Sequence, residues 1–177
     1  MSKYACCFSV ELIKSVTAEI SCGERGDPET EFAYSEAQKI LQFKPDRLGH
    51  ALLLPPSLQA ALLESRIPVE SCPTSNVMTL ELATHHSGSL LEGLKTHPQL
   101  EQWLDSDYPL SINTDDPGVF DTTATKEWRL LQKAYNLSRE KLNDIVIKSM
   151  DYAFCNASTK ETVVKRIKEK LAALNRA

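Results

Sequence analysis

Short apolar segments alternate along the chain with longer segments whose apolar positions recur at helical spacing. The apolar segments that predict strands are residues 15–22, 47–54, 68–72 and 110–113. The segments that predict helices are residues 28–43, 56–65, short pieces between 89 and 104, and most of the chain after Phe120. Apolar strands that alternate with helices are typical of a parallel sheet with helices packed against it. The pattern therefore predicts an α/β fold with about four parallel strands, outer helices and a helical C-terminus.

Local signals place some of the element ends. Asp27-Pro28-Glu29 combines a capping residue, a proline at the first helical position and an acid in the first turn, which predicts a helix start. The polar residues 73–76 directly follow a predicted strand and are interpreted as a loop. Ser158-Thr159-Lys160-Glu161 has the spacing of a capping box and predicts the start of the last helix.

Polar side chains gather where the predicted strands end, and the most informative of them are two adjacent acids. Asp115 and Asp116 end the apolar strand 110–113, and Pro117-Gly118 turns the chain away. Neighbouring residues on a strand point in roughly opposite directions, so two acids placed there can do two different jobs. Ligands bind at the carboxyl ends of strands in barrels and open α/β sheets alike. A solvated Asp-Asp-Pro turn is the alternative interpretation of this segment.

Composition limits the possible partners and compartments. The net charge of −4 and the absence of a long Lys/Arg run argue against nucleic acids and acidic membranes as partners. The five cysteines lack CxxC spacing, which indicates reduced thiols and a cytoplasmic protein. No segment has the length of a membrane span, and we expect no signal peptide.

Four motifs occur in an order and at a spacing that resemble a known family. They are Arg47-Leu48-Gly49-His50, Cys72-Pro73-Thr74-Ser75-Asn76, His97-Pro98 and residues 111–120. Together they resemble the second half of the adenosine/AMP deaminase family of metal-dependent hydrolases, in particular its adenosine deaminase-like branch, which is similar to N6-methyl-AMP deaminases. The resemblance implies the C-terminal half of a (β/α)8 TIM-type barrel. We interpret residues 1–177 as a single partial domain, with an atypical segment 1–20 and a family-like segment 21–177.

The resemblance also implies a reaction and roles for four residues. In this family a zinc ion activates water, which displaces the 6-amino substituent of a purine nucleoside or nucleotide. Glu24 matches the acid that protonates the purine ring, and His50 matches the histidine that orients the metal-bound water. Asp115 matches a zinc ligand, and Asp116 matches the acid that hydrogen-bonds purine N7. An alternative register places Glu19 at the position of the catalytic acid.

The chain departs from the family pattern at the other zinc ligands. The family takes two ligands from a His-x-His motif, whereas this sequence has only His50, His85, His86 and His97. The third ligand position holds Ser21, or Val16 in the alternative register. We therefore expect the chain alone to be truncated, inactive and unable to retain zinc. The alternative function is a non-catalytic half-barrel remnant that acts as an interaction module, or an incomplete gene product, and either form is open to self-association through its barrel edges.

Several residues near these motifs have a simpler structural interpretation. His85 and His86 lie in a Ser/Gly-rich segment and are expected to be solvated, although they could serve as replacement metal ligands. Cys72 is expected to be a small buried residue. His97 is expected to cap or start a helix. The polar residues 74–76 either form a turn or line the pocket.

Overall fold

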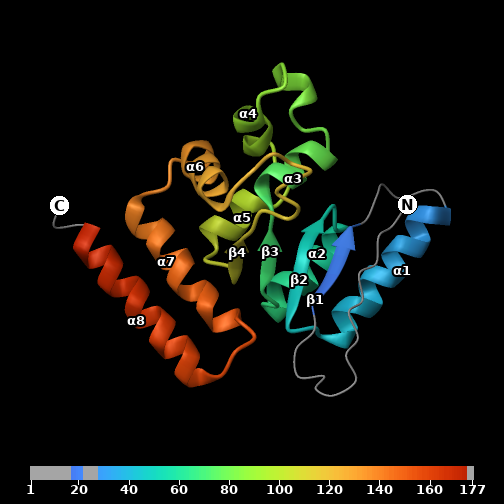
Figure 1. Cartoon of the computed structure of the whole chain (residues 1–177). Coiled ribbons are helices and arrows are strands. Elements are labelled where there is room, and N and C mark those ends of the chain that lie inside the picture. The colour runs from blue at the N-terminus through green and yellow to red at the C-terminus, as the bar shows by residue number, and fades with distance from the viewer. Residues whose placement is uncertain (1–16, 22–27, 175–177) are drawn as a thin grey trace.

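A computed structural model describes residues 17–21 and 28–174, with side chains from residue 34 onward. Its centre is a four-stranded sheet in the order β1-β2-β3-β4, and all three neighbouring pairs are parallel (Figure 1). The strands are β1 (Thr17–Ser21), β2 (Arg47–Leu52), β3 (Val69–Ser71) and β4 (Leu110–Ile112). Four parallel strands in chain order, joined by helices, confirm the predicted half of a TIM-type barrel.

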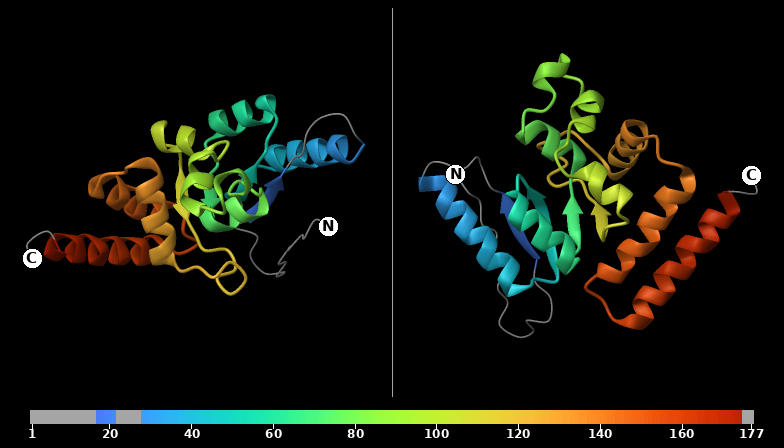
Figure 2. Two further views of the ribbon diagram at one scale, coloured as in Figure 1. Left: turned by 90° about the horizontal axis from the view of Figure 1, so that it is seen from above. Right: turned by 180° about the vertical axis from the view of Figure 1, so that it is seen from behind.

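Helices connect and flank the strands (Figure 1). They are α1 (Pro28–Phe43), α2 (Pro56–Ser65), α3 (Pro73–Thr79), α4 (Leu90–Lys95), α5 (Leu100–Asp105), α6 (Ala124–Tyr135), α7 (Arg139–Ser149) and α8 (Ala157–Leu174), with 3-10 turns η1 (Thr84–His86) and η2 (Met150–Tyr152). Helix α1 lies beside β1 at one edge of the sheet, and α7 lies beside β4 at the other, with α8 outside it (Figures 1 and 2). Both α1 and α2 span the residues that the sequence predicted.

Apolar side chains from the strands and the helices form one continuous core. Leu48 of β2, Val69 of β3 and Leu110 of β4 are all buried in this core. The core also takes side chains from α2, α4, α5, α6 and α7, among them Leu62, Leu94, Trp103, Leu131 and Ile145. Full burial of one such side chain contributes roughly 1.5–3 kcal/mol.

Strand β2 carries an irregularity at His50, one of the predicted site residues. Glu19 of β1 pairs with Gly49, whereas Ser21 pairs with Leu52, so β2 has one extra residue in this interval. His50 and Ala51 occupy the extra length with φ of 56° and 51°, in the left-handed region that non-glycine residues rarely adopt. A bulge of this kind turns a side chain out of the regular alternation of the strand.

Two predicted features at helix starts are wrong. Residues 73–76 do not form a loop, because helix α3 begins directly after β3 with Pro73 in its first turn. A proline is tolerated at that position, since the first helical N–H groups need no intrahelical partner. The last helix begins at Ala157 rather than at a capping box on Ser158, because the side-chain oxygen of Asn156 accepts from Thr159 N at 2.8 Å.

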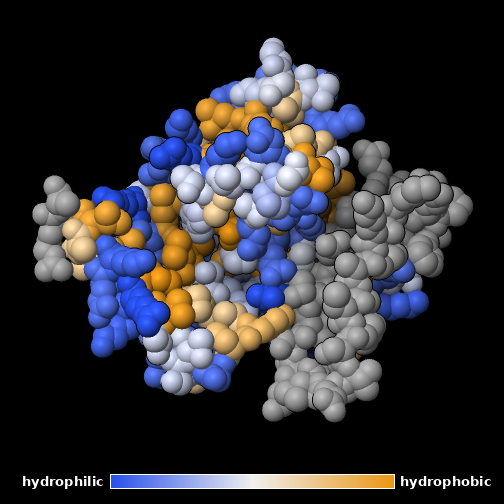
Figure 3. All heavy atoms as spheres, in the orientation of Figure 1, coloured by the Kyte–Doolittle hydropathy of each residue, from blue (hydrophilic) through white to orange (hydrophobic). Residues whose placement is uncertain are grey.

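Helix α8 lies at the surface and has no buried residue within its described length. In Figure 3 hydrophilic residues cover its outer side, and hydrophobic residues appear on the side next to α7. The expected solvated, amphipathic C-terminal helix is thus present up to Leu174. Among the described residues, no helix is both long enough and apolar enough to cross a membrane.

Candidate active site

Two predicted site residues from different strands meet at the carboxyl end of the sheet. His50 comes from the bulge of β2, and Asp115 lies just beyond β4 with φ 57°. Their side chains approach to 3.7 Å between His50 Nε2 and Asp115 Oδ2. The histidine side chain is 21% exposed and the aspartate side chain 34%, so both groups reach solvent from a partly enclosed position. The expectation that His50 and Asp115 share one rim of the sheet is confirmed.

The first turn of α3 holds Asp115 in place. The Ser75 hydroxyl donates to Asp115 Oδ2 across 2.6 Å, a short hydrogen bond to a charged acceptor. Nearby, Asn113 N donates to Ser71 O at 2.8 Å, which extends the pairing of β3 and β4 up to the residues that precede the acid. Helix α3 therefore supplies a buried polar side chain that fixes the carboxylate.

A cavity of about 470 Å³ opens beside these two residues. It is lined by Gly49, His50, Glu70, Cys72, Ile112, Asn113, Thr114, Asp115 and Ala124. The lining therefore comes from β2, β3 and β4, from the N-cap of α3, from the segment that follows β4 and from the first residue of α6. A cavity of this size lies within the usual range for small-molecule sites.

Asn76 and His97 continue the polar network inward from His50. The Asn76 amide lies 2.9 Å from His50 Nδ1 and 3.2 Å from His97 Nε2. His97 Nδ1 accepts hydrogen bonds from the backbone N–H groups of Gln99 and Leu100 at the start of α5. The expected role of His97 as a helix cap is confirmed, and burial lowers the pKa of its imidazole from 6.5 to about 4.

Glu127 of α6 is a buried acid to which the sequence assigned no role, although Thr122 and Glu127 continue the family resemblance. It is 1% exposed, and its Oε2 accepts from Thr74 N at 2.9 Å. Its Oε1 accepts from the Thr122 hydroxyl. The carboxylate thus joins the first turn of α3 to the segment that carries the acid pair. In the sequence it stands four residues after Thr123, the N-cap of α6.

Asp116 lies next to Asp115 but takes part in a different set of contacts. Its Oδ1 accepts from Gly118 N at 3.1 Å and Val119 N at 3.2 Å, so that it stabilises the turn after β4. Asp116 is not among the residues that line the cavity. Its role toward a purine stays a prediction. Glu24 lies outside the described residues, and of Glu19 only the place in β1 is described.

One cluster among the described residues could supply metal ligands. Single donor atoms of His50, Cys72 and Asp115 all lie within 4.8 Å of one another. Burial is the main reason that the pKa of the Cys72 thiol rises from 9.0 to about 12, and the nearby carboxylates of Asp115, Glu70 and Glu127 raise it further. The thiol is therefore protonated near neutral pH and is a poor ligand in that state. His85 is exposed and His86 partly exposed, and neither belongs to this cluster.

These residues do not make up the family's zinc site. The resemblance implies four protein ligands, three of them histidines, and only Asp115 occupies one of those positions. His50 matches a residue that orients water rather than a ligand. One carboxylate does not hold zinc tightly, so the donor set of the described residues does not by itself fit the ion.

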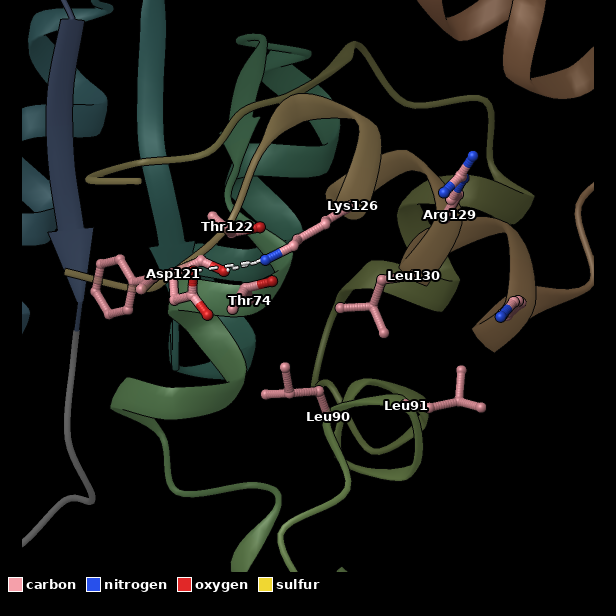
Figure 4. A pocket seen from close by; sticks show the side chains of 10 residues that line it. Thr74, Leu90, Leu91, Asp121, Thr122, Lys126, Arg129 and Leu130 are labelled. Carbon is pink, nitrogen blue, oxygen red and sulfur yellow. Dashed lines mark hydrogen bonds and ion pairs between the residues drawn. The ribbon is translucent and has the colours of Figure 1, made fainter. Parts of the chain in front are cut away.

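A second cavity, of about 480 Å³, lies between α4 and α6 (Figure 4). It is lined partly by Leu90, Leu91 and Leu130, with Lys126 and Arg129 at its border. Lys126 Nζ donates to the backbone oxygen of Asp121 at 2.8 Å, the contact drawn in Figure 4. This cavity shares no lining residue with the one that holds His50 and Asp115.

Comparison with known proteins identifies the family of the chain. A family model described as adenosine deaminase matches residues 1–170. The chain is 31% identical over 154 residues to the adenosine deaminase-like protein of Drosophila melanogaster, a match that covers 87% of this chain and 41% of the fly protein. The chain therefore spans well under half the length of this relative.

Solved structures give the same result. The apo N6-methyl-AMP deaminase of Arabidopsis thaliana superposes with a TM-score of 0.68 at 28% identity, over 85% of this chain and 40% of that one. An Arabidopsis structure complexed with IMP also gives a TM-score of 0.68, at 26% identity and with the same two coverages.

Proposed function

Because the chain belongs to the adenosine deaminase family, we propose that it forms the part of a purine deaminase that carries His50 and Asp115 of the catalytic site. The proposed reaction is hydrolytic removal of the 6-amino substituent from a nucleoside or nucleotide of the adenosine, AMP or N6-methyl-AMP type. The observation that carries the proposal is the approach of His50 Nε2 and Asp115 Oδ2 to 3.7 Å beside one cavity.

A nucleotide is the favoured substrate class. The solved relatives include an N6-methyl-AMP deaminase and a complex with IMP, the product that such a reaction would release. The cavity beside His50 and Asp115 combines apolar walls from Ile112 and Ala124 with polar groups from Asn113 and Thr114. Such a mixed lining suits a flat heterocycle with polar edges.

Each side chain has a proposed role that its contacts permit. Asp115, fixed by the Ser75 hydroxyl, acts as a metal ligand. His50 faces the cavity and orients the attacking water. Asp116 contacts purine N7, and Glu24 delivers the proton to the purine ring. Zinc, when bound, supplies a hydroxide near neutral pH. These residues do not by themselves complete a zinc ligand set.

A second candidate is a non-catalytic half-barrel that associates with another polypeptide. One reason is that Asp115 is the single zinc ligand that the family resemblance assigns. A second reason is that β1 and β4 are the edge strands of the described sheet, and each has one hydrogen-bonded neighbour there. Parallel edge strands present unpaired backbone groups to any further strand. We propose the cytoplasm as the compartment for either candidate, because Cys72 and Cys155 are free thiols in the structure.

Complementation tests the first candidate. The chain would be mixed or co-expressed with the N-terminal part of the Drosophila relative that the match leaves uncovered, and conversion of N6-methyl-AMP to IMP would be followed by chromatography. We expect Asp115→Asn to abolish conversion and Asp121→Asn, an exposed acid outside the cavity, to leave it unchanged. Conversion that survives Asp115→Asn would contradict the proposal.

A further inference from the structure

A line of three polar side chains runs inward from the cavity and ends at a helix start. It consists of His50, Asn76 and His97, joined by contacts of 2.9 Å and 3.2 Å through the Asn76 amide. Asn76 is fully buried and His97 is 5% exposed. Because Asn76 and His97 are buried, two donors that face each other in this line would have no water to pair with instead.

The inner end of the line fixes one proton. His97 Nδ1 accepts from Gln99 N at 3.2 Å and from Leu100 N at 3.0 Å. A ring nitrogen that accepts two N–H groups carries no proton itself. The proton of the His97 imidazole is therefore on Nε2, the atom that faces Asn76.

The proton on His97 Nε2 in turn fixes the amide of Asn76. In the structure Asn76 Oδ1 faces His50 and Nδ2 faces His97, an orientation that sets two donors against each other across 3.2 Å in a buried position. Rotation of the amide by half a turn about the Cβ–Cγ bond exchanges Oδ1 and Nδ2 and keeps both contacts. In the satisfied arrangement, Oδ1 accepts from His97 and the NH2 group donates to His50 Nδ1.

We infer that His97 and Asn76 hold the proton of neutral His50 on Nε2, so that this ring presents an N–H donor to the cavity. Asn76 and His97 are thus positioning residues that act through His50. The distance of 3.7 Å from Nε2 to Asp115 Oδ2 exceeds a hydrogen bond, which leaves the donor available for a water or substrate atom beside the carboxylate.

The assignment decides between two uses of His50. A nitrogen that carries a proton cannot coordinate a metal ion, so His50 does not act as a ligand together with Cys72 and Asp115 despite their proximity. It acts instead as a donor to the attacking water or to the purine. This use in catalysis rests on the proposed function, whereas the position of the proton rests on the geometry of this chain alone.

Nitrogen-15 NMR of the uniformly labelled chain tests the inference without any turnover. Long-range correlations between ring carbon-bound protons and ring nitrogens distinguish the two neutral tautomers, and mildly alkaline pH keeps ordinary imidazoles neutral. We expect both His50 and His97 to carry the proton on Nε2. In Asn76→Asp the new carboxylate can only accept, so His50 should become protonated on Nδ1 while His97 is unchanged.

A control separates this effect from a general change of structure. His85→Gln removes an exposed histidine outside the line and should leave the signals of His50 and His97 in place. A proton on Nδ1 of His50 in the unsubstituted chain would overturn the inference, and this spectrum decides even if Asn76→Asp fails to fold. An Asn76→Asp chain that keeps the His50 proton on Nε2 alone would also overturn the inference.

Discussion

Ser75 and Asp115 are joined by a hydrogen bond of 2.6 Å that links the first turn of α3 to the end of β4. The two residues are 40 positions apart in the chain. The bond fixes the carboxylate that, as we propose, binds metal, and it makes a buried serine part of the site.

We expect Ser75→Ala to destabilise the chain by about 1 kcal/mol. A hydrogen bond to a charged group contributes roughly 1.5–3 kcal/mol when shielded, and the partial exposure of Asp115 reduces that figure. Urea denaturation measures the change. Ser158→Ala, at an exposed position of α8, is the control and should alter the free energy of unfolding far less. Equal effects of both substitutions would show that the bond adds nothing.

Glu127 should be among the most sensitive polar residues of the fold. Glu127→Ala leaves Thr74 N and the Thr122 hydroxyl without their acceptor and opens a cavity, so we expect a loss of about 3 kcal/mol. Glu127→Gln keeps one oxygen for Thr74 N and should cost about 1 kcal/mol.

Thermal or urea unfolding of both Glu127 variants gives these values. Glu64→Ala, which removes an exposed acid of α2, serves as the matched control. The interpretation of Glu127 as a link between α3 and the segment before α6 fails if alanine and glutamine have the same effect.

His97 should make the stability of the chain depend on pH. Burial lowers its pKa in the folded state from 6.5 to about 4, so the unfolded chain binds more protons in this interval. The contribution of His97 to the free energy of unfolding is therefore fully present above about pH 6.5. It decreases as the pH falls toward 4, by up to about 3 kcal/mol.

The difference in unfolding free energy between the unsubstituted chain and His97→Gln isolates this contribution across the same pH range. The difference should shrink as the pH falls, since the variant has no imidazole to protonate. A difference that is constant with pH would show that His97 binds its proton equally well in both states.

The parts of the fold that follow from local pattern were predictable from the sequence. Pro28 marks the start of α1, and the apolar runs identified all four strands in their parallel order. The approach of His50 and Asp115 was also predictable, because the carboxyl ends of parallel strands share one edge of the sheet.

The sequence was misinterpreted at residues 74–76, whose polar groups bind residues of distant elements. Residues 74–76 suggested a loop because they are polar, yet all three are buried. Thr74 donates to Glu127, Ser75 donates to Asp115, and Asn76 joins two histidines. Partners 21 to 53 positions away satisfy these groups, and no local pattern reveals such pairings. The bulge at His50 was not predictable for the same reason, because it lies in the pairing of β2 with β1 and not in a local pattern of β2.

The central claim is that these 177 residues hold part of a deaminase site and do not complete its metal centre. Elemental analysis of zinc in the purified chain, after dialysis against zinc-containing and then zinc-free buffer, tests it most directly. We expect well under one zinc per chain and no conversion of N6-methyl-AMP, because Asp115 is the only residue that the family resemblance assigns as a zinc ligand. One tightly bound zinc per chain, lost in Asp115→Asn and accompanied by turnover, would contradict it.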